Sequence, residues 1–166
     1  MARIREIGAD ELEAFVDVLA RAMPREEMGG VAGLIDWRRQ AEAMIWLLAE
    51  KDGAVAGAGY ALTGWHTPPH RGIGAALVLP DRRGHGLGDE LRAILERWAV
   101  EHGATELDAP VAEGDDGSLA WAAARGYEEA GRNSRMVLDL TAIEAPAVEP
   151  PAGIEIVTWA ERPDLA

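Results

Sequence analysis

The sequence predicts a mixed α/β domain with one central mixed sheet and helices on both of its faces. Its 166 residues are 48% hydrophobic and 27% charged, which suits one globular core rather than a disordered chain. Hydrophobic patterns follow one another in the order β-α-α-β-β-β-α-β-α-β-β. The clearest of them, Leu91, Ile94, Leu95 and Trp98, places four apolar side chains on one face of a helix.

Each element rests on a local pattern. Alternating apolar residues indicate strands, a spacing of three and four indicates helices, and Asp52-Gly53 predicts a tight hairpin turn. The expected elements are a strand at 2–7, helices starting at Leu12 and Val31, strands at 44–49, 54–62 and 73–79, a helix from Gly88 to Gly103, a strand at 106–111, a helix at 118–125, and strands at 127–132 and 135–140 around an Asn133-Ser134 turn.

Charge and cysteine content narrow the function classes. Sixteen basic and 29 acidic residues give a net charge of −13, which disfavours binding to nucleic acid or to an anionic membrane. Acidity is compatible with a cationic substrate, although it also commonly serves solubility. The chain has no cysteine, which excludes disulfides, thiolate metal sites and a cysteine nucleophile. With no apolar leader after Met1 and no membrane-length apolar run, we expect a cytoplasmic protein without a metal.

One glycine-rich turn carries chemical information. A strand ends at Leu79-Pro80, and Gly84, Gly86 and Gly88 lead directly into the long helix. The first amides of a helix have no internal partner and favour anions, and glycines let a ligand approach the backbone. Arg82, Arg83 and His85 add positive charge to this turn. The pattern predicts a diphosphate site, although a glycine turn alone can also be a tight strand-to-helix connection.

Two common phosphate motifs do not fit this turn. A P-loop needs Gly-Lys-Ser/Thr, and no lysine stands here. A dinucleotide fingerprint belongs to the first strand–helix junction of a domain, whereas this turn follows the fourth predicted strand.

The stretch Arg83-Gly84-His85-Gly86-Leu87-Gly88, which follows Leu77-Val78-Leu79-Pro80, resembles the acyl-CoA motif of the GNAT superfamily, the GCN5-related N-acetyltransferases. The element order from Ala2 to Leu140 is similar to that of the family, and Gly126-Tyr127 resembles its Gly-Phe turn. The resemblance implies that acetyl-CoA is the co-substrate and that pantetheine pairs with the fourth strand. The residues it implies for acetyl-CoA contact are Leu77, Val78, Leu79, Arg82, Arg83, Gly84, His85, Gly86, Leu87, Gly88, Asp115 and Ser118.

Catalytic residues are less clear. Family members often carry a tyrosine acid at the position of Ala122, and Trp121 beside it cannot act as that acid. The substitutes we can name are Ser118, on the helix expected near the thiol, and the loop histidines His66 and His70, although loop histidines are more often solvated than catalytic. The resemblance therefore leaves two hypotheses about the function. One is an N-acetyltransferase in which a small or peptidic primary amine attacks acetyl-CoA directly. The other is a degenerate module that binds acyl-CoA, or packs against a partner domain, without turnover.

The C-terminal part has its own composition. We expect a domain at 1–140, a Pro-containing linker at 141–153 and a trailing strand at 154–166. This strand and the polar residues after it resemble the start of the chain, where Arg3–Ile7 precedes Ala9-Asp10-Glu11-Leu12. The trailing segment is thus the start of a second GNAT repeat, as in tandem acetyltransferases, or a plain C-terminal strand with a polar tail. Such a strand would pair with a sheet edge of this chain or of a neighbouring copy in a homodimer.

Overall fold

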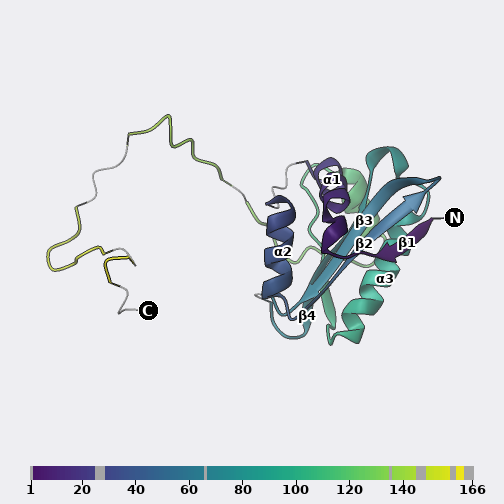
Figure 1. Ribbon diagram of the computed structural model, residues 1–166, viewed down its shortest axis with the longest axis horizontal. Helices are drawn as coiled ribbons and strands as arrows, with labels where there is room; N and C mark the ends of the chain where they lie inside the picture. The colour runs from purple at the N-terminus through teal and green to yellow at the C-terminus, as the bar shows by residue number, and fades with distance from the viewer. Residues whose placement is uncertain are drawn as a thin grey trace. The chain divides into compact units, whose positions relative to one another are not determined.

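Five strands form one sheet whose order in space, β1-β2-β3-β4-β5, is also their order along the chain. A computed structural model describes residues 2–24, 29–65, 67–134, 136–144, 149–157 and 160–162. The strands are β1 (Arg3–Glu6), β2 (Ala43–Lys51), β3 (Ala54–Thr63), β4 (Arg71–Val78) and β5 (Glu106–Asp108). The first four pair antiparallel and β5 joins β4 in parallel, so the predicted mixed sheet is confirmed (Figure 1).

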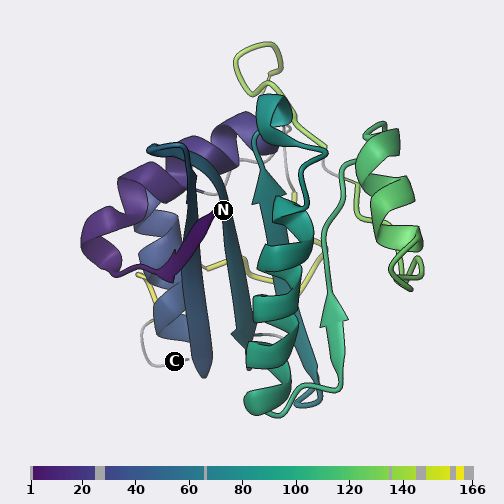
Figure 2. The same ribbon diagram turned by 90° about the vertical axis from the view of Figure 1, so that its right-hand side faces the viewer.

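Helices cover both faces of this sheet. They are α1 (Leu12–Ala22), α2 (Gly30–Gln40), α3 (Leu87–Glu101) and α4 (Asp116–Ala123), with single 3₁₀ turns at η1 (Ala9–Glu11) and η2 (Pro80–Arg82). One buried cluster joins α1 and α2 to the sheet, and a second joins α3 to its other face. Figure 2 shows α3 in front of the strands and α4 to the side of β5. None of the helices among the described residues has the length and apolar character needed to span a bilayer.

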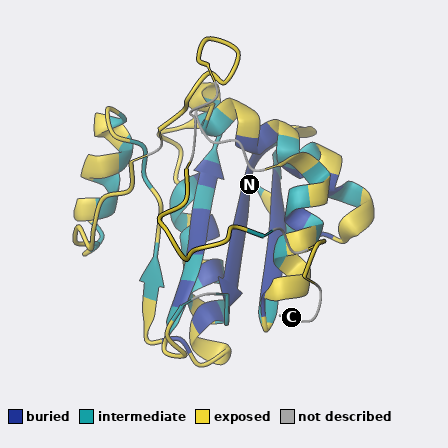
Figure 3. Ribbon diagram, turned by 90° about the vertical axis from the view of Figure 1, so that its left-hand side faces the viewer, coloured by how far each residue is buried: buried dark blue, intermediate teal, exposed yellow. Residues whose placement is uncertain are grey.

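Strand β2 shows why its sequence is apolar throughout. Met44, Trp46 and Leu48 belong to the cluster under α1 and α2, whereas Ile45 and Leu47 belong to the cluster under α3. Because side chains alternate between the two faces, a strand covered on both sides needs apolar residues at every position. Figure 3 colours these central strands as buried and the outer surfaces of the helices as exposed.

The hairpin turn between β2 and β3 uses two residues with left-handed backbone. Asp52 and Gly53 have φ angles of 55° and 76°, as the tight turn of a two-residue hairpin requires, so the predicted hairpin between β2 and β3 is confirmed.

Strand β5 is shorter than the predicted 106–111 and ends at Asp108. Pro110 lies two residues further on and has no N–H to donate to a ladder.

The two strands predicted at 127–132 and 135–140 do not form in their described residues. Met136 and Val137 are 92% and 82% exposed, so their apolar pattern has no buried face. A hairpin is marginal by itself and needs an adjoining strand, and β5 offers only three residues. The trailing strand is also absent from residues 154–157, where Ile154 is 60% exposed and no ladder partner is present, while Thr158 lies outside the described residues.

The chain divides into two units, Met1–Ala130 and Gly131–Ala166. The first unit ends at Ala130, and the domain boundary expected at 140 stays a prediction. The linker and the second repeat stay predictions.

Glycines on β3 let α3 approach the sheet. A Cβ on Gly57 would lie 2.6 Å from the Leu77 carbonyl oxygen and 3.4 Å from the methyl carbons of Leu87 and Leu91. The same face carries Gly59, whose Cβ position is 3.1 Å from a Leu95 methyl. Because these two glycines have no side chain, the leucines of α3 can pack directly against the backbone of β3.

Gly57→Ala should lower the free energy of unfolding by about 1–3 kcal/mol, because the added methyl meets a backbone carbonyl that cannot move alone. Urea denaturation followed by circular dichroism measures this change. Gly131→Ala is the matched control, because nothing lies within 4 Å of its Cβ position, and its effect should stay within about 0.5 kcal/mol. Equal midpoints for the two variants would contradict the packing argument.

Candidate functional site

Strands β4 and β5 pair over three residues only and then separate. Arg71, Gly72 and Ile73 face Glu106, Leu107 and Asp108 in the register. The Arg71 guanidinium holds this closed end, 2.7 Å from a Glu106 carboxylate oxygen and 3.8 Å from one of Asp108. If the β4–β5 register continued, Pro110 would stand opposite Ala75. Proline has no backbone N–H, so it cannot donate a hydrogen bond to the ladder there. The second half of β4 therefore keeps an open edge beside β5.

A cavity of about 490 Å³ fills the space left by this separation. Its wall includes residues 74–78 of β4, the turn into α3, the chain after β5 and the inner side of α4. Ala22 and Met23 at the end of α1 also line it, together with Asp89, Arg92 and Leu95 of α3. Because α1 and α3 cover opposite faces of the sheet, the wall of the cavity combines residues from both faces.

The register with β3 decides which main-chain groups of β4 face the cavity. The Leu79 amide donates to the Ala56 carbonyl at 3.1 Å, and the Leu77 carbonyl oxygen also points to β3. Main-chain groups alternate in direction along a strand, so those of Ala76 and Val78 face the cavity. This corrects the expectation for Leu77 and Leu79, whose main-chain groups are used within the sheet; Leu77 still contributes to the wall, and Leu79 is buried away from it.

The glycine turn opens α3 beside this edge. Gly84 and Gly86 have φ angles of 79° and 81°, and the Gly86 carbonyl accepts from the Asp89 and Glu90 amides to start the helix. The amides of Leu87 and Gly88 belong to the first helical turn, where no intrahelical acceptor exists, and both residues line the cavity. A Cβ on Gly86 would meet nothing within 4 Å, so space for a ligand lies directly over the backbone. These features fit a diphosphate.

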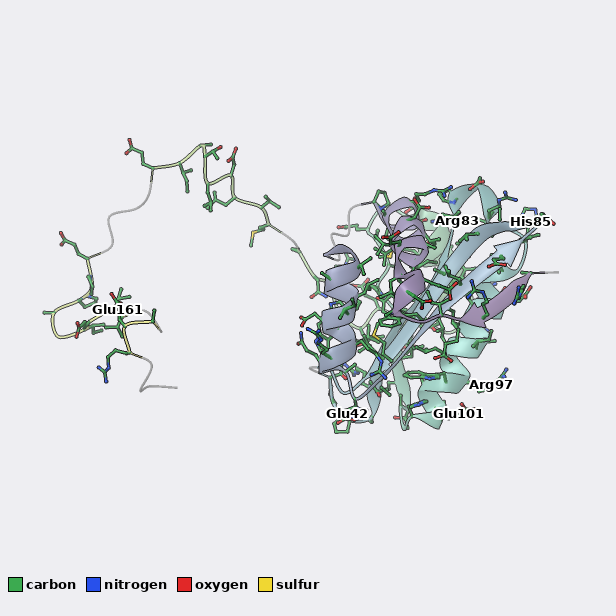
Figure 4. The ribbon with its side chains drawn as sticks, in the orientation of Figure 1. Glu42, Arg83, His85, Arg97, Glu101 and Glu161 are labelled. Atoms are coloured by element: carbon green, nitrogen blue, oxygen red, sulfur yellow. The ribbon has the colours of Figure 1, made fainter. Side chains whose placement is uncertain are left out.

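The charged residues of the turn differ in position. Arg82 and Arg83 line the cavity, whereas the exposed His85 turns its ring back to the Arg83 carbonyl oxygen, 2.7 Å from Nδ1 (Figure 4). Arg83 donates to two acceptors, the Val78 carbonyl oxygen at 3.3 Å from Nε and the Asp115 carboxylate at 3.1 Å.

Asp115 and Ser118 form the N-terminal cap of α4. The Asp115 carboxylate accepts from the Ser118 amide at 3.0 Å and from its hydroxyl at 2.8 Å. These bonds, chiefly the hydroxyl, lower the pKa of Asp115, with a smaller contribution from the charge of Arg83. Both residues lie on the cavity wall, and the Ser118 hydroxyl is engaged as a donor to a carboxylate.

Helix α4 is held by contacts that sequence patterns did not reveal. None of its residues is buried, yet a Cβ on Gly88 would lie 3.4 Å from the Trp121 ring. Arg125 stacks on that ring at 4.4 Å and pairs with Asp89 of α3, with 2.6 Å between Nη2 and Oδ2. Trp121 and Arg125 are separated by one helical turn, and that spacing is the only sequence signal of this contact.

The remaining candidates lie elsewhere. His70 is exposed at the closed end of β4, where its Nε2 is 3.9 Å from Glu106, and it does not line the cavity. His66 lies outside the described residues. Ala122 lines the cavity with a methyl group only. The half-buried Tyr127 donates to Glu96 at 3.1 Å, and burial together with that carboxylate raises the pKa of the phenol to about 12. Within the described part of the chain, no cluster of three or more potential metal ligands occurs.

A splayed mixed sheet with a glycine turn that opens α3 beside the splay defines a CoA-dependent acyltransferase fold. The model of the acetyltransferase (GNAT) family matches residues 5–127, and the chain belongs to this family. The chain is accordingly an N-acetyltransferase of a family that uses acetyl-CoA, with the acceptor unspecified.

Solved structures share this fold. The aminoglycoside N-acetyltransferase AAC(6')-Iy, in complex with CoA, superposes with a TM-score of 0.64 at 22% identity over 83% of this chain and 95% of its own. AAC(6')-Ih from Acinetobacter baumannii gives 0.62 at 20% identity over 84% and 99%, respectively. An acetyltransferase from Trypanosoma brucei gives 0.61 at 20% identity over 83% and 100%. No curated protein matches the chain in sequence.

Acidification should release α4 from α3. The hydrogen bond from Arg125 lowers the pKa of Asp89, so the pair stabilises docking above the ordinary aspartate value of about 3.9 and loses this contribution as the pH falls through the lowered value. Hydrogen-exchange protection of α4 amides should therefore fall as the pH drops below about 4. In Asp89→Asn the low protection should already be present at neutral pH. Asp17→Asn is the control, because Asp17 pairs with Arg21 within α1 alone. Protection that is the same in Asp89→Asn and wild type at neutral pH would contradict this role.

Proposed function

We propose that the chain transfers the acetyl group of acetyl-CoA directly to a primary amine within the cavity between β4 and β5. The observation that carries this proposal is the continuity of that cavity. It runs from the first turn of α3, past the open edge of β4, to the end of α1 on the opposite face of the sheet. A ligand held on the α3 side and an acceptor entering from the α1 side can therefore meet inside the sheet.

The residues present fit acetyl-CoA. The amides of Leu87 and Gly88, with Arg82 beside them, suit the diphosphate, and the outward main chain of Ala76 and Val78 suits an amide-bearing arm that adds to the strand. When bound, acetyl-CoA supplies an activated thioester. The chain supplies position, because the turn and the strand edge hold two separate parts of one ligand.

Direct attack follows from the nucleophiles that the wall offers. Among the described residues that line the cavity, only Ser118 and Tyr127 carry hydroxyl groups, and the chain has no cysteine. The Ser118 hydroxyl donates to a carboxylate whose lowered pKa makes it a poor base, so it is not activated. The Tyr127 phenol, with a pKa of about 12, stays protonated. An acyl-enzyme intermediate therefore has no suitable residue on this wall.

Proton transfer relies on the acceptor and on water. The carboxylates of Asp89 and Asp115 on the wall both have lowered pKa values, so neither is a good base near neutral pH. An ordinary thiol has a pKa of about 8.5, so a thiolate can leave without a strong acid. Ala122 in place of an acid is compatible with turnover on these grounds.

The acceptor is proposed at the level of a cationic amine. The net charge of −13 favours approach of a cation. Two of the structural neighbours named above are aminoglycoside N-acetyltransferases, whose names describe amine-bearing acceptors. A second candidate function is a module that binds acyl-CoA without turnover. It is favoured by Ala122, whose methyl group on the cavity wall cannot act as an acid.

Acetyl-CoA should raise the thermal stability of the protein, whereas ATP should not. At about 100 times its dissociation constant it should add about 2.7 kcal/mol to the free energy of unfolding. Gly86→Val should remove this shift, because the side chain would project into the open space over the turn. Gly103→Val is the matched control. Gly103 has a φ of 86° and open space as well, so it bears the same backbone strain, but it lies at the far end of α3. Equal responses of the two variants to acetyl-CoA would place the diphosphate elsewhere.

The rate with a small primary amine should rise with pH as the free amine forms, with no additional ionisation of the enzyme between about pH 6 and 8. His70→Ala should leave this profile unchanged, because His70 does not line the cavity. Initial rates of thiol release, measured over this range, test both statements. CoA binding without thiol release across a panel of amines would favour the non-catalytic module. A His70→Ala profile that loses an ionisation would restore the histidine as a base.

A further inference from the structure

Arg83 bridges the mouth of the cavity. Its Nε donates to the Val78 carbonyl oxygen at 3.3 Å, and its Nη1 donates to the Asp115 carboxylate at 3.1 Å. Val78 is the last residue of β4, and Asp115 is the N-cap of α4, so one side chain joins the two walls. Figure 4 shows Arg83 and His85 beside each other along the upper side of the folded part.

The first of these contacts uses a group that a ligand needs. The Val78 carbonyl faces the cavity, and it is the outermost of the groups that the open edge of β4 presents there. Any ligand whose amide pairs with this carbonyl must compete with the guanidinium of Arg83. A carbonyl oxygen has two lone pairs, but the Arg83 side chain also occupies space beside it on the wall.

The second contact can be given up at low cost. Asp115 keeps two hydrogen bonds from Ser118 after Arg83 leaves, so its carboxylate stays partnered. The Arg83 side chain is 40% exposed, and an ion pair at this exposure is weak. A diphosphate is a stronger partner, because a guanidinium binds phosphate oxygens through paired, charge-assisted hydrogen bonds. The amides of Leu87 and Gly88 would hold that anion close to Arg83.

We propose that Arg83 is a specificity-determining strap, which occupies the Val78 carbonyl in the free protein and releases it to ligands that carry a diphosphate. The inference rests on the proposed acyl-CoA cavity and adds a selection rule to it. A CoA thioester draws Arg83 away from Val78 and Asp115 with its own anion, and so opens the strand edge for its own arm. A pantetheine thioester without phosphate cannot do this and must displace Arg83 unaided. The strap therefore favours CoA thioesters over phosphate-free thioesters.

Calorimetric titration of CoA and of pantetheine into three variants tests the strap. The chain has no cysteine, so neither thiol forms a mixed disulfide with it. Arg83→Met should strengthen pantetheine binding roughly 3- to 10-fold, since one competing hydrogen bond is lost, and should weaken CoA binding at least about 10-fold. Asp115→Asn frees Arg83 without removing it, so it should strengthen both ligands by about 2- to 5-fold. Arg97→Met, an exposed arginine further along α3, removes the same charge away from the cavity and should change neither.

Opposite responses of CoA and pantetheine to Arg83→Met support the strap. If Arg83→Met weakens both ligands, or leaves pantetheine unchanged, Arg83 is a simple ligand contact and the strap is wrong, although the proposed function stands. Failure of the wild-type protein to bind CoA overturns the proposed function and the strap together. If thermal melts show that Arg83→Met does not fold, Asp115→Asn decides, and no gain in pantetheine affinity in that variant overturns the strap.

Discussion

The early end of the β4–β5 ladder is the constraint from which the site follows. Pairing stops after Ile73 and Asp108, and Pro110 cannot donate to any continuation. Half of β4 is thereby left with backbone groups that need partners and with a cavity beside them. A sheet that closed fully would satisfy these groups internally and leave no route between the α1 and α3 faces.

In the proposed function, helix α3 makes this opening an anion site. Gly57 and Gly59 allow its leucines to lie directly on β3, which fixes the helix axis and brings its first turn to the end of β4. The N-terminal amides of α3 and the open edge of β4 therefore meet at one corner of the cavity. Neither feature alone distinguishes a coenzyme site from an ordinary loop, whereas the two together match a ligand with a diphosphate and an amide-bearing arm.

The position of helix α4 depends on contacts at the same corner of the cavity. The helix buries no residue, and its described contacts with α3 and the turn run through Trp121 on Gly88, Arg125 on Asp89, and Asp115 on Arg83. In the proposed function, ligand binding and α4 docking share contacts, so each would influence the other. The cavity wall, as described, relies on positioned backbone and arginines rather than on a side chain with a pKa near neutrality. In the proposed chemistry, the protein therefore contributes chiefly by orienting the bound reactants.

The sequence by itself determined the local elements. The apolar run of β2, the Asp52-Gly53 hairpin, the stripe of α3 and the glycine turn before it are each marked by a pattern of near neighbours in the chain. Only the tertiary structure decided that the main-chain groups of Ala76 and Val78, rather than those of Leu77 and Leu79, face the cavity, because the register with β3 sets that parity. It also decided that the alternating residues 127–140 form no strand in their described part, and that Trp121 and Arg125 anchor α4. The physical reason is common to all three. Strand pairing and side-chain docking depend on partners distant in the chain, and a local pattern does not identify them.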